Sequence, residues 1–148
     1  MLTFKKITSD ADFDSKLSRE TFVDFLYQHL DQFGDSKQAI NKCIDFAFGI
    51  NGGMGGFLYA AYQGDQLVGV IVFNNTGMSE FIPEHILVYI AVDAKFRGKG
   101  YGREIVEKAL KDCPGNVKLH VEYENPAKRL YERIGFTSKY AEMRLNKK

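Results

Sequence analysis

The hydrophobic positions along the chain follow two periods, and these predict strands mixed with helices. Short apolar or alternating runs, which are typical of strands, lie at residues 2–8, 57–62, 67–73, 86–92 and 117–122. Apolar residues spaced three and four apart, which are typical of one helix face, lie at residues 22–30, 39–47, 103–113 and 127–134. Residues 136–145 are expected to add one or two final strands. The pattern predicts one α/β domain, residues 1–148, around a mixed sheet.

Polar and glycine-rich segments separate these elements. Gln63-Gly64-Asp65-Gln66 predicts a hairpin between two strong strands. Residues 51–56 are rich in glycine and predict a mobile loop, either a flap beside a substrate or a plain connection. Pro126 suits the first turn of a helix, where its missing N–H costs nothing, and Gly135 is expected to end that helix.

Composition removes several classes of function. The chain has 148 residues and a formal net charge of +1, which argues against nucleic-acid binding through bulk positive charge. Its two cysteines, Cys43 and Cys113, stand in no metal-ligand pattern, so no metal site is expected. The sequence has no apolar run long enough to span a membrane and no secretory signal at its N-terminus, so we expect a cytoplasmic protein. Whether it forms a homodimer is left open.

The most informative segment is Arg97-Gly98-Lys99-Gly100-Tyr101-Gly102. It follows a buried strand and precedes an amphipathic helix. Such a turn directs several backbone N–H groups at one point and adds the positive end of the helix dipole. Arg97, Lys99 and Arg103 supply further positive charge. The segment therefore predicts a site for a phosphate or pyrophosphate, although a tight structural connection is the plain alternative.

Two well-known phosphate motifs do not fit this turn. A P-loop requires Ser or Thr after its lysine, whereas Lys99 is followed by Gly100. The dinucleotide-binding fingerprint has the spacing G-x-G-x-x-G, whereas the spacing here is G-x-G-x-G. The bound group is therefore expected to be a phosphorylated cofactor of another kind.

A second motif follows about 25 residues later: Asn125-Pro126-Ala127-Lys128-Arg129-Leu130-Tyr131-Glu132-Arg133-Ile134-Gly135-Phe136. Taken with the strand and the R-x-x-G-x-G turn, it resembles the GNAT superfamily of acyl-CoA-dependent N-acyltransferases. The resemblance covers residues 86–136 sharply, and only the element order supports it before that. It implies a mixed, mostly antiparallel twisted sheet with a central splay, flanked by about four helices.

The resemblance also implies a cofactor site. The cofactor would be acetyl-CoA, used as a co-substrate without a metal. Its pyrophosphate would bind the backbone N–H groups of Arg97, Gly98, Lys99, Gly100, Tyr101 and Gly102. Its pantetheine arm would pair with the strand at Ile90-Ala91-Val92, because a splayed edge leaves backbone groups unpaired. Asn125 matches the family residue near the arm.

The reaction implied is acetyl transfer to a primary amine by direct attack in a ternary complex. Tyr131 matches the residue that protonates the leaving CoA thiolate, although a tyrosine on an inner helix stripe is also ordinary core. Glu84 and His120 match positions of the general base in different family members, and His120 replaces a carboxylate. For both, a solvated strand residue is the plain alternative. His85 points to the opposite face from Glu84.

Two functions remain open at this stage. The first is an N-acetyltransferase, and the alternative is an acyl-CoA sensor of the same fold without transferase activity. The acceptor is expected to be a small amine or a peptide, with no nucleic acid or membrane partner. Its pocket is expected among the helices at 18–49 and the loops 51–56 and 74–80, with five aromatic residues as wall candidates: Tyr59, Tyr62, Phe73, Phe81 and Tyr89.

Overall fold

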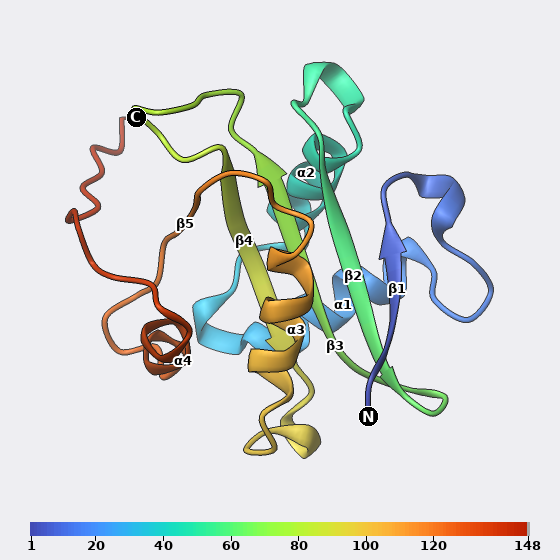
Figure 1. Cartoon of the computed structure of the whole chain (residues 1–148). Helices are drawn as coiled ribbons and strands as arrows, with labels where there is room; N and C mark the ends of the chain where they lie inside the picture. Colours follow the sequence, from blue (N-terminus) through green and yellow to red (C-terminus); the bar gives the residue numbers. More distant parts are fainter. Residues whose placement is uncertain (148) are drawn as a thin grey trace.

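The protein is built on one five-stranded sheet, seen in a computed structural model that describes residues 1–147 (Figure 1). The strands follow sequence order across the sheet: β1 (Thr3–Ile7), β2 (Gly56–Gln63), β3 (Gln66–Asn75), β4 (His85–Val92) and β5 (Val117–Leu119). Neighbouring strands from β1 to β4 are antiparallel, and β5 runs parallel to β4. The expectation of a mixed, mostly antiparallel sheet is confirmed.

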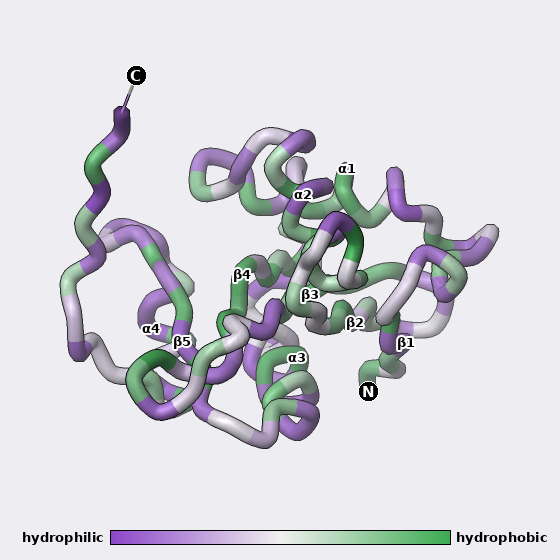
Figure 2. Tube along the Cα trace, turned by 90° about the horizontal axis from the view of Figure 1, so that it is seen from above, coloured by the Kyte–Doolittle hydropathy of each residue, from purple (hydrophilic) through white to green (hydrophobic). Residues whose placement is uncertain are grey.

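Four α-helices accompany the sheet within the described residues: α1 (Arg19–Leu30), α2 (Lys37–Ala47), α3 (Tyr101–Leu110) and α4 (Ala127–Ile134). Figure 2 shows α1 and α2 on one side of the sheet and α3 on the other. The Ser18 and Ser36 side chains accept hydrogen bonds from backbone N–H groups in the first turns of α1 and α2. These caps explain where both helices begin.

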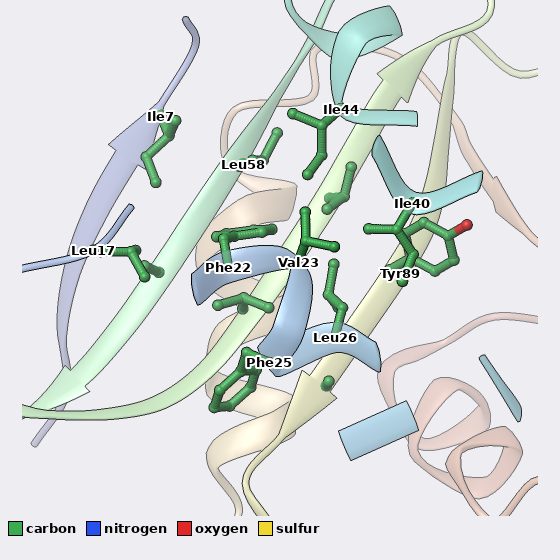
Figure 3. Packing of buried hydrophobic residues seen from close by; sticks show 14 of the residues in the cluster. Ile7, Leu17, Phe22, Val23, Phe25, Leu26, Ile40, Ile44, Leu58 and Tyr89 are labelled. Carbon is green, nitrogen blue, oxygen red and sulfur yellow. The ribbon is translucent and has the colours of Figure 1, made fainter. Parts of the chain in front are cut away.

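Each face of the sheet buries its own hydrophobic cluster. Figure 3 shows the first cluster, in which Phe22, Val23 and Leu26 of α1 meet Ile40 and Ile44 of α2 over the sheet. The second cluster lies under α3 and is centred on Ile71, Phe73, Ile105, Val106 and Ala109. Because both faces are covered, β3 is buried from Val68 to Asn74. Such a strand is continuously apolar rather than alternating, as the sequence of β3 predicts.

Two expectations about the C-terminal part were wrong. β5 ends at Leu119 and not at residue 122, and residues 136–147 form no regular strand. Beyond Leu119 no β4 residue pairs with this segment in the described structure, so nothing continues its ladder. Tyr140, Met143 and Leu145 are 83%, 89% and 84% exposed. Met143 and Leu145 alternate with polar residues as in a strand, but this segment has no neighbouring strand to pair with in the described structure. Within residues 1–147, no helix is both long and apolar enough to cross a membrane.

Candidate active site

A large cavity of about 1060 Å³ lies beside β4, where β5 leaves the sheet. One wall is β4 itself, and a second is formed by the connection from α1 to α2 at residues 29–35. The start of α3 lies at one end, and residues 120–127 and α4 complete the enclosure. The cavity therefore joins the two sequence motifs with a wall from the N-terminal half.

The edge of β4 that faces the cavity has lost its neighbouring strand. β4 pairs with β5 only at His85–Leu87, but it pairs with β3 as far as Val92. The pairing with β3 shifts register between Val72 and Phe73, which leaves Val88 as an extra residue on β4. Such a bulge bends the strand and changes the direction of the residues that follow.

Two hydrogen bonds establish the amide directions on either side of this bulge. The His85 N–H donates to the Asn116 carbonyl at 3.0 Å, toward β5, whereas the Asp93 N–H donates to the Val68 carbonyl at 2.8 Å, toward β3. Backbone N–H groups alternate sides along a strand, so the N–H groups of Ile90 and Val92 point away from β3. Their N–H groups face the cavity. This is the edge that the family resemblance assigns to the pantetheine arm.

The glycine turn forms the end of the cavity next to α3. Gly98 and Gly100 have φ angles of 79° and 82°, in the left-handed region that glycine adopts without strain. No atom lies within 4 Å of where a Cβ would stand on either residue. Gly100 directly precedes α3, and the Glu104 N–H is bound to its carbonyl. The N–H groups of Tyr101, Gly102 and Arg103 in the first turn are therefore left for a ligand or water.

Gly102 has a different role from the other two glycines. A Cβ on Gly102 would stand 3.2 Å from Leu130 Cδ2 and 3.8 Å from Val92 Cγ2. This glycine therefore allows α3, α4 and β4 to approach one another closely. A glycine is therefore required at position 102 for packing, in addition to any requirement from a bound ligand.

The basic residues of the turn are held in different ways. Arg97 donates to the Val92 carbonyl at 3.1 Å and to the His29 carbonyl at 2.6 Å, so its guanidinium joins the end of β4 to the end of α1. The Lys99 ammonium lies 5.7 Å from the centre of the Phe96 ring. Arg103 lines the cavity and contacts Glu107 at 3.3 Å. Arg97 and Arg103 line the cavity, whereas Lys99 does not, so its predicted part in binding an anion stays a prediction.

The second motif places Asn125 and Tyr131 on the cavity wall. The Asn125 side chain accepts a hydrogen bond from the Ala127 N–H at 2.9 Å and so caps the start of α4. Tyr131 is only 8% exposed, and its ring packs edge-on against Phe136. Burial raises the pKa of Tyr131 to about 12. Its hydroxyl therefore remains protonated at neutral pH and is available as a donor.

His120 is the first residue after β5 and also lines the cavity. Partial burial, followed in size by the positive charge of Lys118, lowers its pKa below the ordinary value of 6.5. Neutral imidazole is thus the main form at pH 7, and it can accept a proton. The structure brings His120 and Tyr131 to the same cavity from two different segments.

Comparison with known proteins settles the family. The sequence profile of the acetyltransferase (GNAT) domain matches residues 54–138, more than half of the chain. The chain belongs to the GNAT acetyltransferase family. The matched segment holds β4, the glycine turn and Tyr131, but it excludes α1 and α2. The wall at residues 29–35 therefore lies outside the GNAT match.

Individual relatives agree with this assignment. N-alpha-acetyltransferase 30 of Xenopus laevis is 34% identical over 84 residues, and this GNAT chain spans 30% of its length. A GNAT-family acetyltransferase from Streptococcus pneumoniae superposes over 100% of both chains with a TM-score of 0.69 at 19% identity. Ribosomal-protein-alanine N-acetyltransferase from Brucella melitensis superposes over 99% of both, with a TM-score of 0.65 at 15% identity. These two structures share the GNAT fold.

Glu84 lies apart from the cavity, and Lys99 is the other predicted site residue that does not line it. Its carboxylate accepts hydrogen bonds from the Asn116 N–H at 2.7 Å and the Glu80 N–H at 3.3 Å. These backbone donors, Asn116 first, lower the pKa of Glu84. The contacts hold the loop before β4 against the loop before β5. They support a structural role for Glu84 in this GNAT fold and give no support to its role as a base.

The expected acceptor walls need correction. The loops at 51–56 and 74–80 do not line the cavity but contact each other, and the Asn75 N–H donates to the Gly55 carbonyl at 2.8 Å. Four of the five candidate aromatic residues also lie elsewhere: Tyr59, Tyr62 and Phe73 are in the core, and Phe81 is 77% exposed. Only Tyr89 lines the cavity. Tyr59, Tyr62 and Phe73 are core residues, which is the more common role of an aromatic residue in a strand.

Sequence reasoning expected the acceptor pocket among residues 18–49 but did not single out the wall at residues 29–35. Its members include His29, whose side chain is 10% exposed and faces Asp93 at 3.8 Å, and Asp35, which accepts a hydrogen bond from the Tyr89 hydroxyl at 2.5 Å. The segment follows the end of α1 and has no motif of its own. The one local signal was Gly34 next to Asp35, which marks a chain reversal but not a binding wall.

Proposed function

We propose that this GNAT protein transfers an acetyl group from acetyl-CoA to a primary amine, with both substrates bound before the reaction. The observation that carries the proposal is that the open edge of β4, the glycine turn and Tyr131 line one cavity. The edge suits an extended amide-bearing arm, the turn suits a pyrophosphate, and the hydroxyl suits a thiolate.

The residues present fit this co-substrate. The N–H groups of Ile90 and Val92 offer the donors that β-augmentation requires. Gly98 and Gly100 leave open space where side chains would otherwise stand, so an anion can approach their backbone closely. Acetyl-CoA supplies an acyl group activated as a thioester. Asn125 stands on the same wall and holds the start of α4 in place.

The protein then has two proton transfers to perform. An acceptor amine must lose a proton before it can attack, because an alkyl ammonium has no free electron pair. His120 is neutral at pH 7 and lines the cavity, so we assign it the role of proton acceptor, directly or through water. Tyr131 remains protonated and donates to the departing sulfur. Neither role requires a covalent bond between the protein and the acyl group.

The acceptor enters, in this proposal, beside the wall at residues 29–35. This wall and the segment that carries His120 line the same cavity. The name of the Xenopus relative specifies an α-amine, which supports including peptide N-termini among the acceptors. Small primary amines are the other class that the cavity suits.

A thiol-release assay tests this function. Acetyl-CoA is mixed with the protein and, in turn, with polyamines, aminoglycosides, simple amines and peptides with free N-termini. We expect at least one acceptor to release CoA thiol above the rate without acceptor. CoA binding with no thiol release from any acceptor class would contradict transfer and favour an acyl-CoA sensor. No binding of CoA at all would contradict both functions.

A further inference from the structure

Asp35 is an exposed carboxylate on the wall of the cavity that accepts a hydrogen bond from a residue of β4. The Tyr89 hydroxyl donates to Asp35 Oδ2 at 2.5 Å. Figure 3 shows the Tyr89 ring beside Ile40, with its oxygen at the rim of the cluster. Tyr89 is 9% exposed, and the core of α1 and α2 surrounds its ring. A ring packed in this way positions its hydroxyl, and the hydroxyl positions the carboxylate.

The charge of Asp35 has no cation to balance it. Among residues 1–147, no Lys, Arg or His nitrogen lies within 4 Å of its carboxylate. Four other acids line the cavity: Asp31, Glu122, Glu124 and Glu142. Glu142 contacts Arg144, and among the five acids that line the cavity in the described structure Asp35 is the one that a tyrosine hydroxyl holds. The Tyr89 hydroxyl occupies one oxygen of Asp35. The other oxygen has no partner among the hydrogen bonds of the described structure, so it is available to a ligand.

A carboxylate is poorly suited to hold the attacking nitrogen itself. A nearby negative charge stabilises an ammonium and raises its pKa, so it would keep that nitrogen protonated and unreactive. A second positive group on the acceptor meets no such conflict, because it remains charged throughout the reaction. Tyr89 directly precedes Ile90, so Asp35 stands about one tyrosine side chain away from the open edge of β4. A charged group several bonds from the reacting amine suits that separation.

We propose that Asp35 selects acceptors that carry a second positive charge a few bonds away from the amine that is acetylated. The proposal rests on the transferase function above and names its acceptor class. Two kinds of molecule have this chemistry: a diamine, and a peptide with a basic side chain near its free N-terminus. Tyr89 is a positioning residue in this arrangement, since it acts by holding Asp35.

Matched acceptor pairs test the proposal. We compare kcat/KM for 1,4-diaminobutane against butylamine, and for a peptide with Lys at its second position against the same peptide with norleucine there. The wild-type protein should prefer the charged member of at least one pair by about tenfold, the size expected of one charged hydrogen bond. Preference within the first pair assigns a diamine, and preference within the second assigns a peptide.

Asp35→Asn should reduce this ratio to about one, mainly by raising KM for the charged acceptor. Tyr89→Phe should reduce it partly, because the carboxylate remains but is no longer held. Asp31→Asn is the matched control, since Asp31 lines the same cavity without the tyrosine contact, and it should keep the wild-type ratio. Equal turnover within both pairs, or an unchanged ratio in Asp35→Asn, would overturn the proposal alone. No turnover of any acceptor would overturn it together with the transferase function.

Discussion

Two regions of the cavity are made from different parts of the chain. In the first, the backbone region, the donors are N–H groups of the glycine turn and of β4. In the second, the wall at residues 29–35, the chemistry belongs to side chains such as Asp35, which accepts a hydrogen bond from Tyr89. The first region lies inside the matched GNAT segment, and the second lies outside it.

This difference explains which property a substitution in each region should change. A backbone site requires a particular turn, and glycine is the residue that permits it, so the requirement is written in a short stretch of sequence. A side-chain site requires two residues distant in sequence to meet, as Asp35 and Tyr89 do, and many pairs would serve. We therefore expect substitutions in the glycine turn to affect cofactor binding and substitutions in the wall at residues 29–35 to affect acceptor choice.

Tyr131→Phe should have the largest effect on the chemical step, because Tyr131 is the proposed proton donor to the departing sulfur. The change removes one hydroxyl and keeps the ring against Phe136. We expect kcat to fall by about 10²-fold, which is typical of a lost general acid, with CoA affinity preserved. Steady-state kinetics with any active acceptor and calorimetry with CoA measure the two quantities. Tyr140→Phe, at an exposed tyrosine, is the control, and full kcat in Tyr131→Phe would reduce that residue to a core role.

Gly100→Asp should weaken CoA binding at the glycine turn without affecting the wall at residues 29–35. A carboxylate would stand where the turn offers N–H groups to an anion, so CoA should bind far more weakly. Wild-type protein should gain about 2.7 kcal/mol of stability at CoA one hundred times its Kd, visible as a rise in Tm, and the variant should gain almost none.

Gly64→Asp is the matched control for this change. Gly64 has a φ of 60° and open space around it, as Gly100 does, but it lies in the hairpin between β2 and β3. Both variants therefore carry similar backbone strain. A normal CoA-dependent rise in Tm for Gly100→Asp would make the turn a structural connection. Gly102→Asp is a poorer test, since it also disturbs packing against Leu130.

His120 predicts a particular pH dependence. Its neutral form accepts the proton, and its pKa lies below the ordinary value of 6.5. The acid side of the pH–activity profile should therefore have its midpoint below pH 6.5. His120→Gln should lose that acid-side decline and most of the rate. A wild-type midpoint above pH 6.5, or an unchanged profile in the variant, would exclude His120 as the base.

Glu84→Gln should have the smallest effect, on stability and not on rate. The fold lowers the pKa of Glu84 from its ordinary value of 4.5, so its ionised form stabilises the protein at pH 7. That contribution is present above pH 4.5 and is lost as pH falls through the lower folded pKa. We expect a slightly lower Tm for the variant at pH 7, a difference that shrinks in acid, and kcat within about twofold of wild type. A large fall in kcat at constant Tm would restore Glu84 as a base.

Sequence patterns predicted the GNAT fold because its most recognisable motifs are formed by residues close together in the sequence. The spacing of Ala127, Leu130, Tyr131 and Ile134 specifies the inner face of α4, and Gly98 and Gly100 specify a turn. Residues 142–145 alternate like a strand but form none, because pairing depends on a neighbour that alternation does not reveal. Asp35 was not predicted for a similar reason, since its role comes from a tertiary contact with Tyr89.

Hydrogen exchange at individual amides, measured with and without CoA, tests the central claim most directly. That claim is that the open edge of β4 and the adjoining turn hold the cofactor. We predict slower exchange on CoA binding at the amides of Ile90, Val92 and the first turn of α3. The control is Lys5, which lies in β1 opposite Ala60 of β2, away from the cavity, and should show no change. Unchanged exchange at Ile90 and Val92 under saturating CoA, with protection elsewhere, would contradict the account.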